Sequence, residues 1–201
     1  PFVTIDAQSE PGIPSITVDD RHAAEIAMTH LLEHGHRNVA IVILEDSRPP
    51  DQEQYSGIGR VRMQGYDDAL RRYGMSCGDP GIVRLDEPCT IEGGLLAAQT
   101  IVSDHREVTG IVAMSDVIAL GLYEGVRSAG LRIPDDVSIV GFDDILEAQL
   151  VTPGLTTVHQ PAEEKGRRAG ELLVRMIRDE AVDDRVQFTC ALVERGSVAT
   201  I

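Results

Sequence analysis

Short apolar runs alternate along the chain with longer segments whose apolar residues recur every three or four positions. Runs rich in valine and isoleucine are typical of strands buried on both faces, and the longer spacing is typical of amphipathic helices. Because the two patterns alternate from about residue 19 to residue 159, they predict a doubly wound α/β fold with a parallel sheet. The predicted strands are residues 2–5, 39–44, 82–85, 110–114, 138–142 and 156–158.

Capping residues mark where the predicted helices begin and end. Aspartate accepts hydrogen bonds from the free N–H groups of a first turn, and glycine adopts the left-handed conformation that closes a last turn. The first helix should begin at a cap on Asp19 or Asp20 and stop at Gly35. A later helix should begin at a cap on Asp116 and stop at Gly130. The other helices are predicted at residues 61–73, 92–102 and 163–178.

The composition restricts the classes of function. Eighteen lysine and arginine residues against 33 aspartate and glutamate residues give a formal charge of −15, which opposes binding of the chain body to nucleic acid. No apolar run approaches the roughly 20 residues of a membrane helix, so we expect no membrane contact. The three cysteines, Cys77, Cys89 and Cys190, form no CxxC motif, which indicates a reducing compartment. We therefore expect a cytoplasmic protein.

Polar residues follow the predicted strands directly, where open parallel sheets bind their ligands. They include Ser115 with Asp116, Asp143 with Asp144, and Gln160, and Arg62 follows the loop after an earlier strand. A planar guanidinium and paired carboxylate oxygens suit vicinal hydroxyls or another small polar solute. For Asp116 and Asp144 a structural role as helix caps is the favoured interpretation, whereas Asp143 is assigned to a pocket.

Catalytic and metal sites have little support in the sequence. His30 and His34 share a helical face and His36 follows them, but nothing nearby supplies further zinc ligands, so a structural role is favoured. The chain contains no nucleophile elbow, no HExxH motif and no phosphate-binding loop. We expect no catalytic residue, no bound metal and no cofactor.

Several motifs together resemble the effector-binding core of the LacI/GalR family of bacterial transcriptional repressors. They are HLLEHGH at residues 30–36, Arg62 with Gly65 and Tyr66, the Ser-Asp pair that opens residues 115–121, GLRIPDDVSIVGFDD at residues 130–144 and LTTVHQP at residues 155–161. Their order and spacing match the family over essentially the whole chain. The resemblance implies a periplasmic-binding-protein-like fold of type I in which two lobes enclose a ligand.

The resemblance also implies how the chain divides between the lobes. Residues 1–18 would be a remnant of the N-terminal lobe, whose first half is missing, and residues 19–159 the C-terminal lobe. Residues 160–186 would return to the N-terminal lobe, and residues 187–201 would end the C-terminal lobe. The family binds operator DNA through a helix-turn-helix headpiece, which we expect not to be part of this chain.

Family effector contacts fall on Asp6 and Gln160 from the first lobe and on Arg62, Ser115 and Asp143 from the second. Ser115 departs from the asparagine common in the family. Pro88 or Cys89 stands where many relatives stack an aromatic ring on the ligand, and Tyr55 is the candidate substitute. The family also dimerises side by side, which places Leu120, Tyr123, Leu146 and Leu150 in a homodimer interface.

We therefore interpret the chain as the effector-binding and dimerisation region of a transcriptional regulator. A small polar effector, with sugars favoured by analogy, would change operator affinity through the headpiece. An exported solute-binding protein of the same fold is the alternative, and a signal peptide or a helix-turn-helix in the full gene would distinguish the two. An α/β enzyme is a third class, which would need turnover of a ligand.

Overall fold

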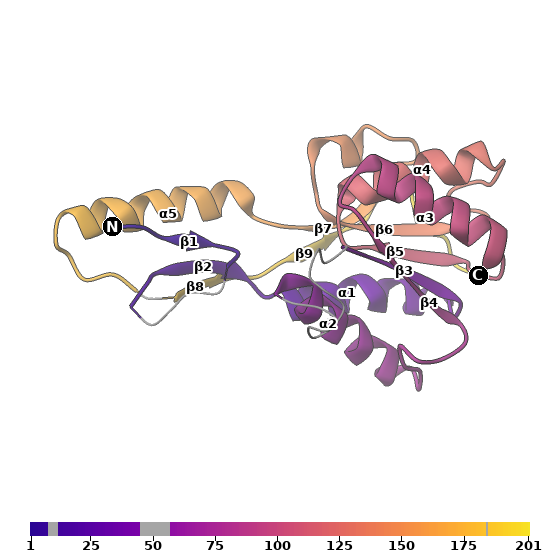
Figure 1. Cartoon of the computed structure of the whole chain (residues 1–201), viewed down its shortest axis with the longest axis horizontal. Helices are drawn as coiled ribbons and strands as arrows, with labels where there is room; N and C mark the ends of the chain where they lie inside the picture. Colours follow the sequence, from indigo (N-terminus) through magenta and orange to yellow (C-terminus); the bar gives the residue numbers. More distant parts are fainter. Residues whose placement is uncertain (8–11, 45–56, 184) are drawn as a thin grey trace.

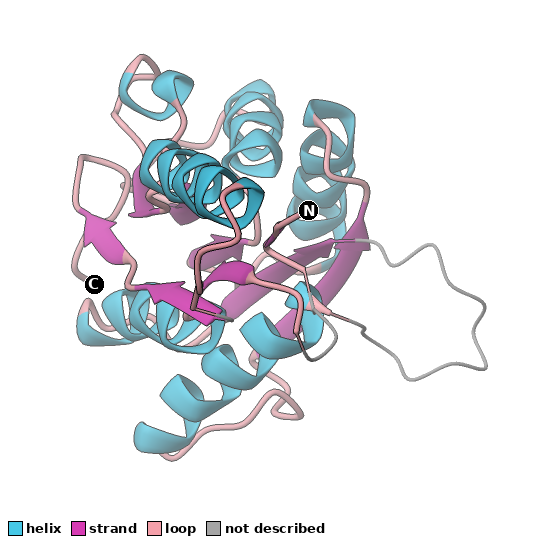
Figure 2. Ribbon diagram, turned by 90° about the vertical axis from the view of Figure 1, so that its left-hand side faces the viewer, coloured by secondary structure: helices cyan, strands magenta, loops and turns pink. Residues whose placement is uncertain are grey.

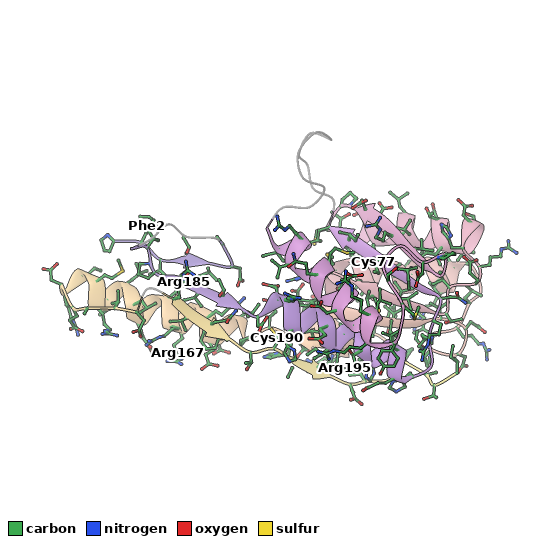
Figure 3. All side chains as sticks on the ribbon, turned by 90° about the horizontal axis from the view of Figure 1, so that it is seen from below. Phe2, Cys77, Arg167, Arg185, Cys190 and Arg195 are labelled. Carbon is green, nitrogen blue, oxygen red and sulfur yellow. The ribbon has the colours of Figure 1, made fainter. Side chains whose placement is uncertain are left out.

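The structure is a computed structural model that describes residues 1–7, 12–44, 57–183 and 185–201. It has two bodies of unequal size, arranged along the longest axis of the molecule (Figure 1). Three chain segments connect them, at residues 18–20, 159–162 and 188–191. Phe2 and Arg185 lie on the smaller body, Cys77 and Arg195 on the larger body, and Cys190 where they meet (Figure 3). No helix in the described ranges is long and apolar enough to cross a membrane.

The larger body is built on a six-stranded sheet with the order β4-β3-β5-β6-β7-β9. Its first five strands are parallel, and β9 runs antiparallel to β7. This order is that of a doubly wound sheet, as the alternation of strands and helices predicts. The strands are β3 (Val39–Leu44), β4 (Ile82–Glu87), β5 (Gly110–Ala113), β6 (Ser138–Asp143), β7 (Thr156–His159) and β9 (Ala191–Val193).

Two pairs of helices cover the two faces of this sheet (Figures 1 and 2). The helices α1 (Asp20–Glu33) and α2 (Ile58–Arg72) bury Met28, Tyr66 and Leu70 against one face. The helices α3 (Ile91–Asp104) and α4 (Asp116–Ser128) bury their apolar faces against the other. Because both faces are covered, the central strands are buried throughout, which explains their continuous apolar sequence.

The smaller body has a three-stranded parallel sheet and one long helix. The strands β1 (Thr4–Ile5) and β8 (Arg185–Phe188) flank β2 (Ser15–Val18). The helix α5 (Ala162–Ile177) packs on this sheet through Ala169 and Leu172, which contact Ile16. A short 3-10 helix, η1 (Leu146–Gln149), lies after β6 in the larger body.

The predicted end signals of α1 are confirmed. The Asp19 carboxylate accepts a hydrogen bond from the backbone N–H of His22 (3.1 Å), and Gly35 has a φ of 96°. The predicted caps at Asp116 and Asp144 are wrong. Ser115 caps α4 by accepting from the N–H of Val117, and η1 follows Ile145 without a side-chain cap.

The three histidines of residues 30–36 have structural contacts. The rings of His30 and His34 lie 4.3 Å apart, and the Nδ1 of His34 is 2.8 Å from the carbonyl oxygen of His30. His36 is buried between the hydroxyl of Thr109 and the carbonyl oxygen of Ala199. These contacts join α1 to the sheet and to the C-terminal segment of the chain.

Helices α3 and α4 approach each other closely at two glycines. A Cβ atom added at Gly121 would lie 2.8 Å from the Cα of Gly94 and would overlap the carbonyl oxygen of Ile91. A Cβ at Gly94 would in turn overlap the carbonyl oxygen of Ile118. The obstacles are backbone atoms, so a larger residue at either position must move a helix.

We expect Gly121→Ala to lower the free energy of unfolding by about 1–3 kcal/mol, as overpacked cores do. Urea denaturation followed by circular dichroism measures the change. Gly59→Ala in α2 is the control, because an added Cβ there meets nothing within 4 Å. The control should be as stable as the parent or more stable by up to about 1 kcal/mol, because alanine favours a helix over glycine. A Gly121→Ala protein as stable as the parent would contradict the close approach.

Candidate functional site

A cavity of about 770 Å³ lies where the two bodies meet. The larger body contributes the ends of β6 and β7, through Asp143, Asp144 and His159. The smaller body contributes Asp6, which follows β1, and the first turn of α5. The volume is in the range of small-molecule sites, and nine of the twelve lining residues are polar or charged. The cavity also follows the carboxyl ends of parallel strands, where open α/β sheets bind ligands.

A continuous chain of hydrogen bonds runs through this cavity from one body to the other. The Ser115 hydroxyl donates to one oxygen of Asp143 (3.2 Å), and the Gln160 amide Nε2 donates to the other (2.7 Å). The Lys165 ammonium donates to the Gln160 Oε1 (2.9 Å) and to the Asp6 carboxylate (2.5 Å). Gln160 therefore links β6 to α5 and lies in one of the segments that connect the bodies.

Three of the cavity aspartates have backbone conformations that L residues adopt rarely. Asp6 has a φ of 52°, Asp143 of 126° and Asp144 of 61°. Such conformations cost free energy and concentrate at ligand sites. Their common location here supports a binding role for this cavity.

The buried carboxylate of Asp116 holds the backbone after β6 in place. It accepts from the Thr157 hydroxyl (2.6 Å) and from the backbone N–H of Ile145 (3.0 Å). A Cβ at Gly141 would overlap its Oδ1, so the strand comes close because this residue is glycine. Asp116 is therefore a structural residue that fixes the strand end carrying Asp143.

Arg62 is nearly buried and contacts the strand ends beside the predicted site residues. Its Nε donates to Asp20 (2.9 Å), and an Nη donates to the carbonyl oxygen of Met114 (2.6 Å). Its guanidinium lies 3.6 Å from the centre of the Phe142 ring. Met114 and Phe142 immediately precede Ser115 and Asp143, so Arg62 supports both strand ends.

Burial and nearby positive charge shift the pKa values of the acidic groups in this region in opposite directions. Burial raises the pKa of Asp143, and the nearby Arg62 charge offsets part of that shift. Burial likewise raises the pKa of Asp20 against the effect of its partner Arg62. At Asp144 burial would raise the pKa, but hydrogen bonds from Arg195 (2.6 Å) and His159 (2.9 Å) lower it. Asp144 is therefore not a helix cap, as the sequence predicted. It forms an ion pair with Arg195.

The structure brings most of the predicted effector residues together. Asp6, Asp143 and Gln160 line the cavity, and Ser115 contacts Asp143. Arg62 does not line this cavity, and its contacts within the described residues include those to Asp20, Met114 and Phe142. Tyr55 lies outside the described residues.

Lys165 is the site residue that sequence reasoning missed. A signal for it exists, because Lys165 precedes Ala169 by one helical turn and Leu172 by two, on the inward face of α5. A lysine on an apolar helix face needs a buried partner. The spacing shows that the residue points inward, but it does not identify Asp6, 159 residues away in the chain, as that partner.

The residues predicted for a dimer interface differ in exposure. Leu146 and Leu150 are 63% and 68% exposed, which is unusual for leucine. Leu120 is half-buried on α4. Tyr123 is only 2% exposed, and its hydroxyl donates to the carbonyl oxygen of Pro153 (3.1 Å). Tyr123 therefore has almost no surface to offer a partner subunit.

Several known proteins are similar to this chain in sequence and in fold. The HTH-type transcriptional repressor CytR of Escherichia coli strain K12 is 33% identical over 190 residues, which are 94% of this chain and 53% of the relative. The ribose operon repressor of the same strain is 31% identical over 174 residues, or 86% of this chain and 50% of the relative. The chain thus spans about half the length of these relatives.

A crystal structure of a LacI family transcriptional regulator from Enterococcus faecium with bound ribose has the same fold. Its TM-score is 0.89 at 28% identity, and the match covers 100% of this chain and 71% of that chain. The family model described as a periplasmic binding protein-like domain matches residues 28–198. The doubly wound α/β fold predicted from the sequence is confirmed. The chain belongs to the periplasmic binding protein-like domain family and has the effector-binding domain of LacI family transcriptional regulators.

Proposed function

We propose that this chain is the sugar-responsive part of a transcriptional repressor. A sugar would bind in the cavity between the two bodies and change their relative arrangement. In the full-length protein, this change would alter the affinity of a DNA-binding segment for operator DNA. The observation that carries the proposal is the chain of hydrogen bonds from Ser115 to Asp6, because a ligand inserted into it contacts both bodies at once.

The chemistry of the cavity supports a polyhydroxylated ligand. Asp143 presents a carboxylate and Gln160 an amide, which accept from and donate to hydroxyl groups. Ser115 and Arg62 would complete the site by holding the strand ends that carry these groups. The ribose bound to the Enterococcus faecium regulator and the ribose operon repressor among the relatives support a sugar over other polar solutes.

A thermal-shift screen with D-ribose, D-glucose, cellobiose and cytidine tests this proposal. A ligand that binds only the folded state at a hundredfold excess over its Kd stabilises it by about 2.7 kcal/mol. In the full-length protein, the same sugar should change operator affinity by the factor by which operator DNA changes sugar affinity. Failure of every sugar to shift the Tm, or a sugar without effect on operator affinity, would count against the proposal.

We expect Asp143→Asn to weaken sugar binding by about tenfold to a hundredfold, because hydrogen bonds to a charged group contribute about 1.5–3 kcal/mol. Isothermal titration calorimetry with the sugar selected by the screen measures the change. Asp135→Asn is the matched control, since the Asp135 side chain is 59% exposed and pairs with Arg132 at the surface. The control should bind as the parent does, and equal affinities in all three proteins would reject Asp143 as a contact.

We also propose that Leu146 and Leu150 lie in an isologous homodimer interface. Both are exposed on or beside η1, while the adjacent Ile145 and Val151 pack into the core of their own body. Two exposed leucines four residues apart favour a covered surface over a solvated one.

The double variant Leu146→Glu/Leu150→Glu should sediment as a folded monomer, because the interface would have to bury two unpaired carboxylates. Val174→Glu/Ile177→Glu is the matched control, because both residues are exposed on α5 in the smaller body. Analytical ultracentrifugation should show the parent and the control as dimers. A monomeric parent at high concentration, or a dimeric double variant, would exclude this interface.

A further inference from the structure

Arg62 carries a buried positive charge beside two carboxylates of the larger body. Its side chain is 5% exposed, and its Nε donates to the Asp20 carboxylate (2.9 Å), its one ion-pair partner among the described residues. The Asp143 carboxylate accepts from Ser115 and Gln160 instead. Burial raises the pKa of Asp143, and the Arg62 charge opposes this effect. A buried cation needs a paired carboxylate, and Asp20, rather than Asp143, fills that role.

Asp20 lies where the chain enters the larger body. It is the first residue of α1, and one of the three connecting segments joins it to β2 of the smaller body. Burial raises the pKa of Asp20 and Arg62 lowers it, with smaller effects from the charges of Asp6 and Lys165 in the smaller body. Helix capping does not account for this carboxylate, because the N-cap of α1 is Asp19. Its direct contact is the pair with Arg62.

The pair with Asp20 fixes the plane of the Arg62 guanidinium. This group is a planar fork, so a hydrogen bond at Nε also determines where its two Nη atoms point. In the observed plane, an Nη donates to the carbonyl oxygen of Met114 (2.6 Å), and the group lies 3.6 Å from the centre of the Phe142 ring. Without its partner at Nε, the guanidinium would turn toward Asp143, the other carboxylate on which its charge acts.

We infer that Asp20 is a positioning residue, which holds Arg62 on the strand ends and thereby keeps the Asp143 carboxylate free to bind a ligand. Asp20 does not line the cavity, so its effect on a ligand passes through Arg62. A pair between Arg62 and Asp143 would compete with the hydrogen bonds that this carboxylate accepts at the cavity. The inference rests on the proposed sugar-binding function and deepens it by naming a residue outside the cavity that controls a ligand contact.

A purely structural role for Asp20 predicts a different behaviour. A carboxylate in a first helical turn interacts favourably with the helix dipole, so its loss lowers the stability of the fold. Such a loss leaves the titration of Asp143 as it was, whereas a positioning role changes it, because the Arg62 charge is no longer shared. The other groups that lower the pKa of Asp143 are uncharged and stay in place when Asp20 is replaced: Gln160, Ser115 and the backbone of Asp116.

An NMR titration of the Asp143 carboxyl tests the inference without a ligand. Carbon-13 labelling of the aspartate side chains gives a carboxyl resonance for each, and the resonance lost in Asp143→Asn belongs to Asp143. In Asp20→Asn the pKa of Asp143 should fall below that in the parent, because the unshared Arg62 charge stabilises the ionised carboxylate. Asp68→Asn is the matched control, since Asp68 and Arg21 also pair across α1 and α2. The control should leave the pKa of Asp143 unchanged.

A double-mutant cycle tests whether Asp20 acts through Arg62. Arg62→Met alone should raise the pKa of Asp143, because burial then acts without an opposing charge. In that background Asp20→Asn should have no further effect on the pKa of Asp143, since the cation through which it acts is gone. Equal shifts from Asp20→Asn in both backgrounds, or no shift in either, would overturn the inference.

The same variants connect the titration to ligand binding. The probes are D-ribose, D-glucose and cellobiose, measured by calorimetry. Asp20→Asn should weaken the sugar that binds the parent by about tenfold, which corresponds to one hydrogen bond to a charged group. Asp68→Asn should bind this sugar as the parent does.

The two measurements separate the inference from the proposed function. Equal sugar affinity in Asp20→Asn and the parent, or weaker binding with an unchanged Asp143 pKa, would overturn the inference and leave the proposed function standing. A lowered Asp143 pKa without sugar binding by the parent would support the role of Asp20 and count against the proposed function. Circular dichroism verifies that each variant is folded, and with an unfolded Arg62→Met the comparison of Asp20→Asn with Asp68→Asn decides.

Discussion

The buried carboxylate of Asp116 is the contact on which the geometry of the cavity between the two bodies depends. It accepts hydrogen bonds from Thr157 on the neighbouring strand and from the backbone that leaves β6. These bonds fix the backbone directly after Asp143 and Asp144, both of which have a positive φ. With the strand end fixed, Asp143 meets Gln160, and Gln160 meets Lys165 in the smaller body. A structural carboxylate in the larger body thereby sets the geometry of a site shared by both bodies.

The two bodies play unequal parts in this site. The larger body supplies rigid groups at strand ends, and Arg62 reinforces them through Met114 and Phe142. The smaller body supplies the ion pair of Lys165 and Asp6, in which Asp6 Oδ1 is buried without a hydrogen-bond partner among the described residues. The smaller body thus contributes the Lys165–Asp6 ion pair to the cavity wall, and the larger body contributes side chains at strand ends. In the proposed function, a ligand that contacts both walls would connect the two bodies.

The sequence predicts the larger body well because its signals are local. Apolar runs and capping residues such as Asp19 and Gly35 locate β3 to β7 and α1 from neighbouring residues alone. The short strands β2 and β8 carry weak periodic signals and pair across more than 160 residues, so periodicity does not reveal them. Asp116 shows the same limit within the site. The capping preference of aspartate predicts an N-cap at this position. The hydrogen-bond partner of Asp116, Thr157, is 41 residues away, so neighbouring residues do not reveal this contact.

The two bodies also differ in how far apart along the chain their paired strands lie. The smaller sheet pairs β2, near the start of the chain, with β8, near its end, while α5 lies between them in sequence. The five parallel strands of the larger sheet, in contrast, lie within residues 39–159. Contacts between distant segments form slowly because their loops must close first. During synthesis from the N-terminus, the parallel part of the larger body therefore assembles before the smaller body is complete. The cavity combines Asp6 with Lys165, 159 residues further along the chain, so it forms only once the smaller body has folded.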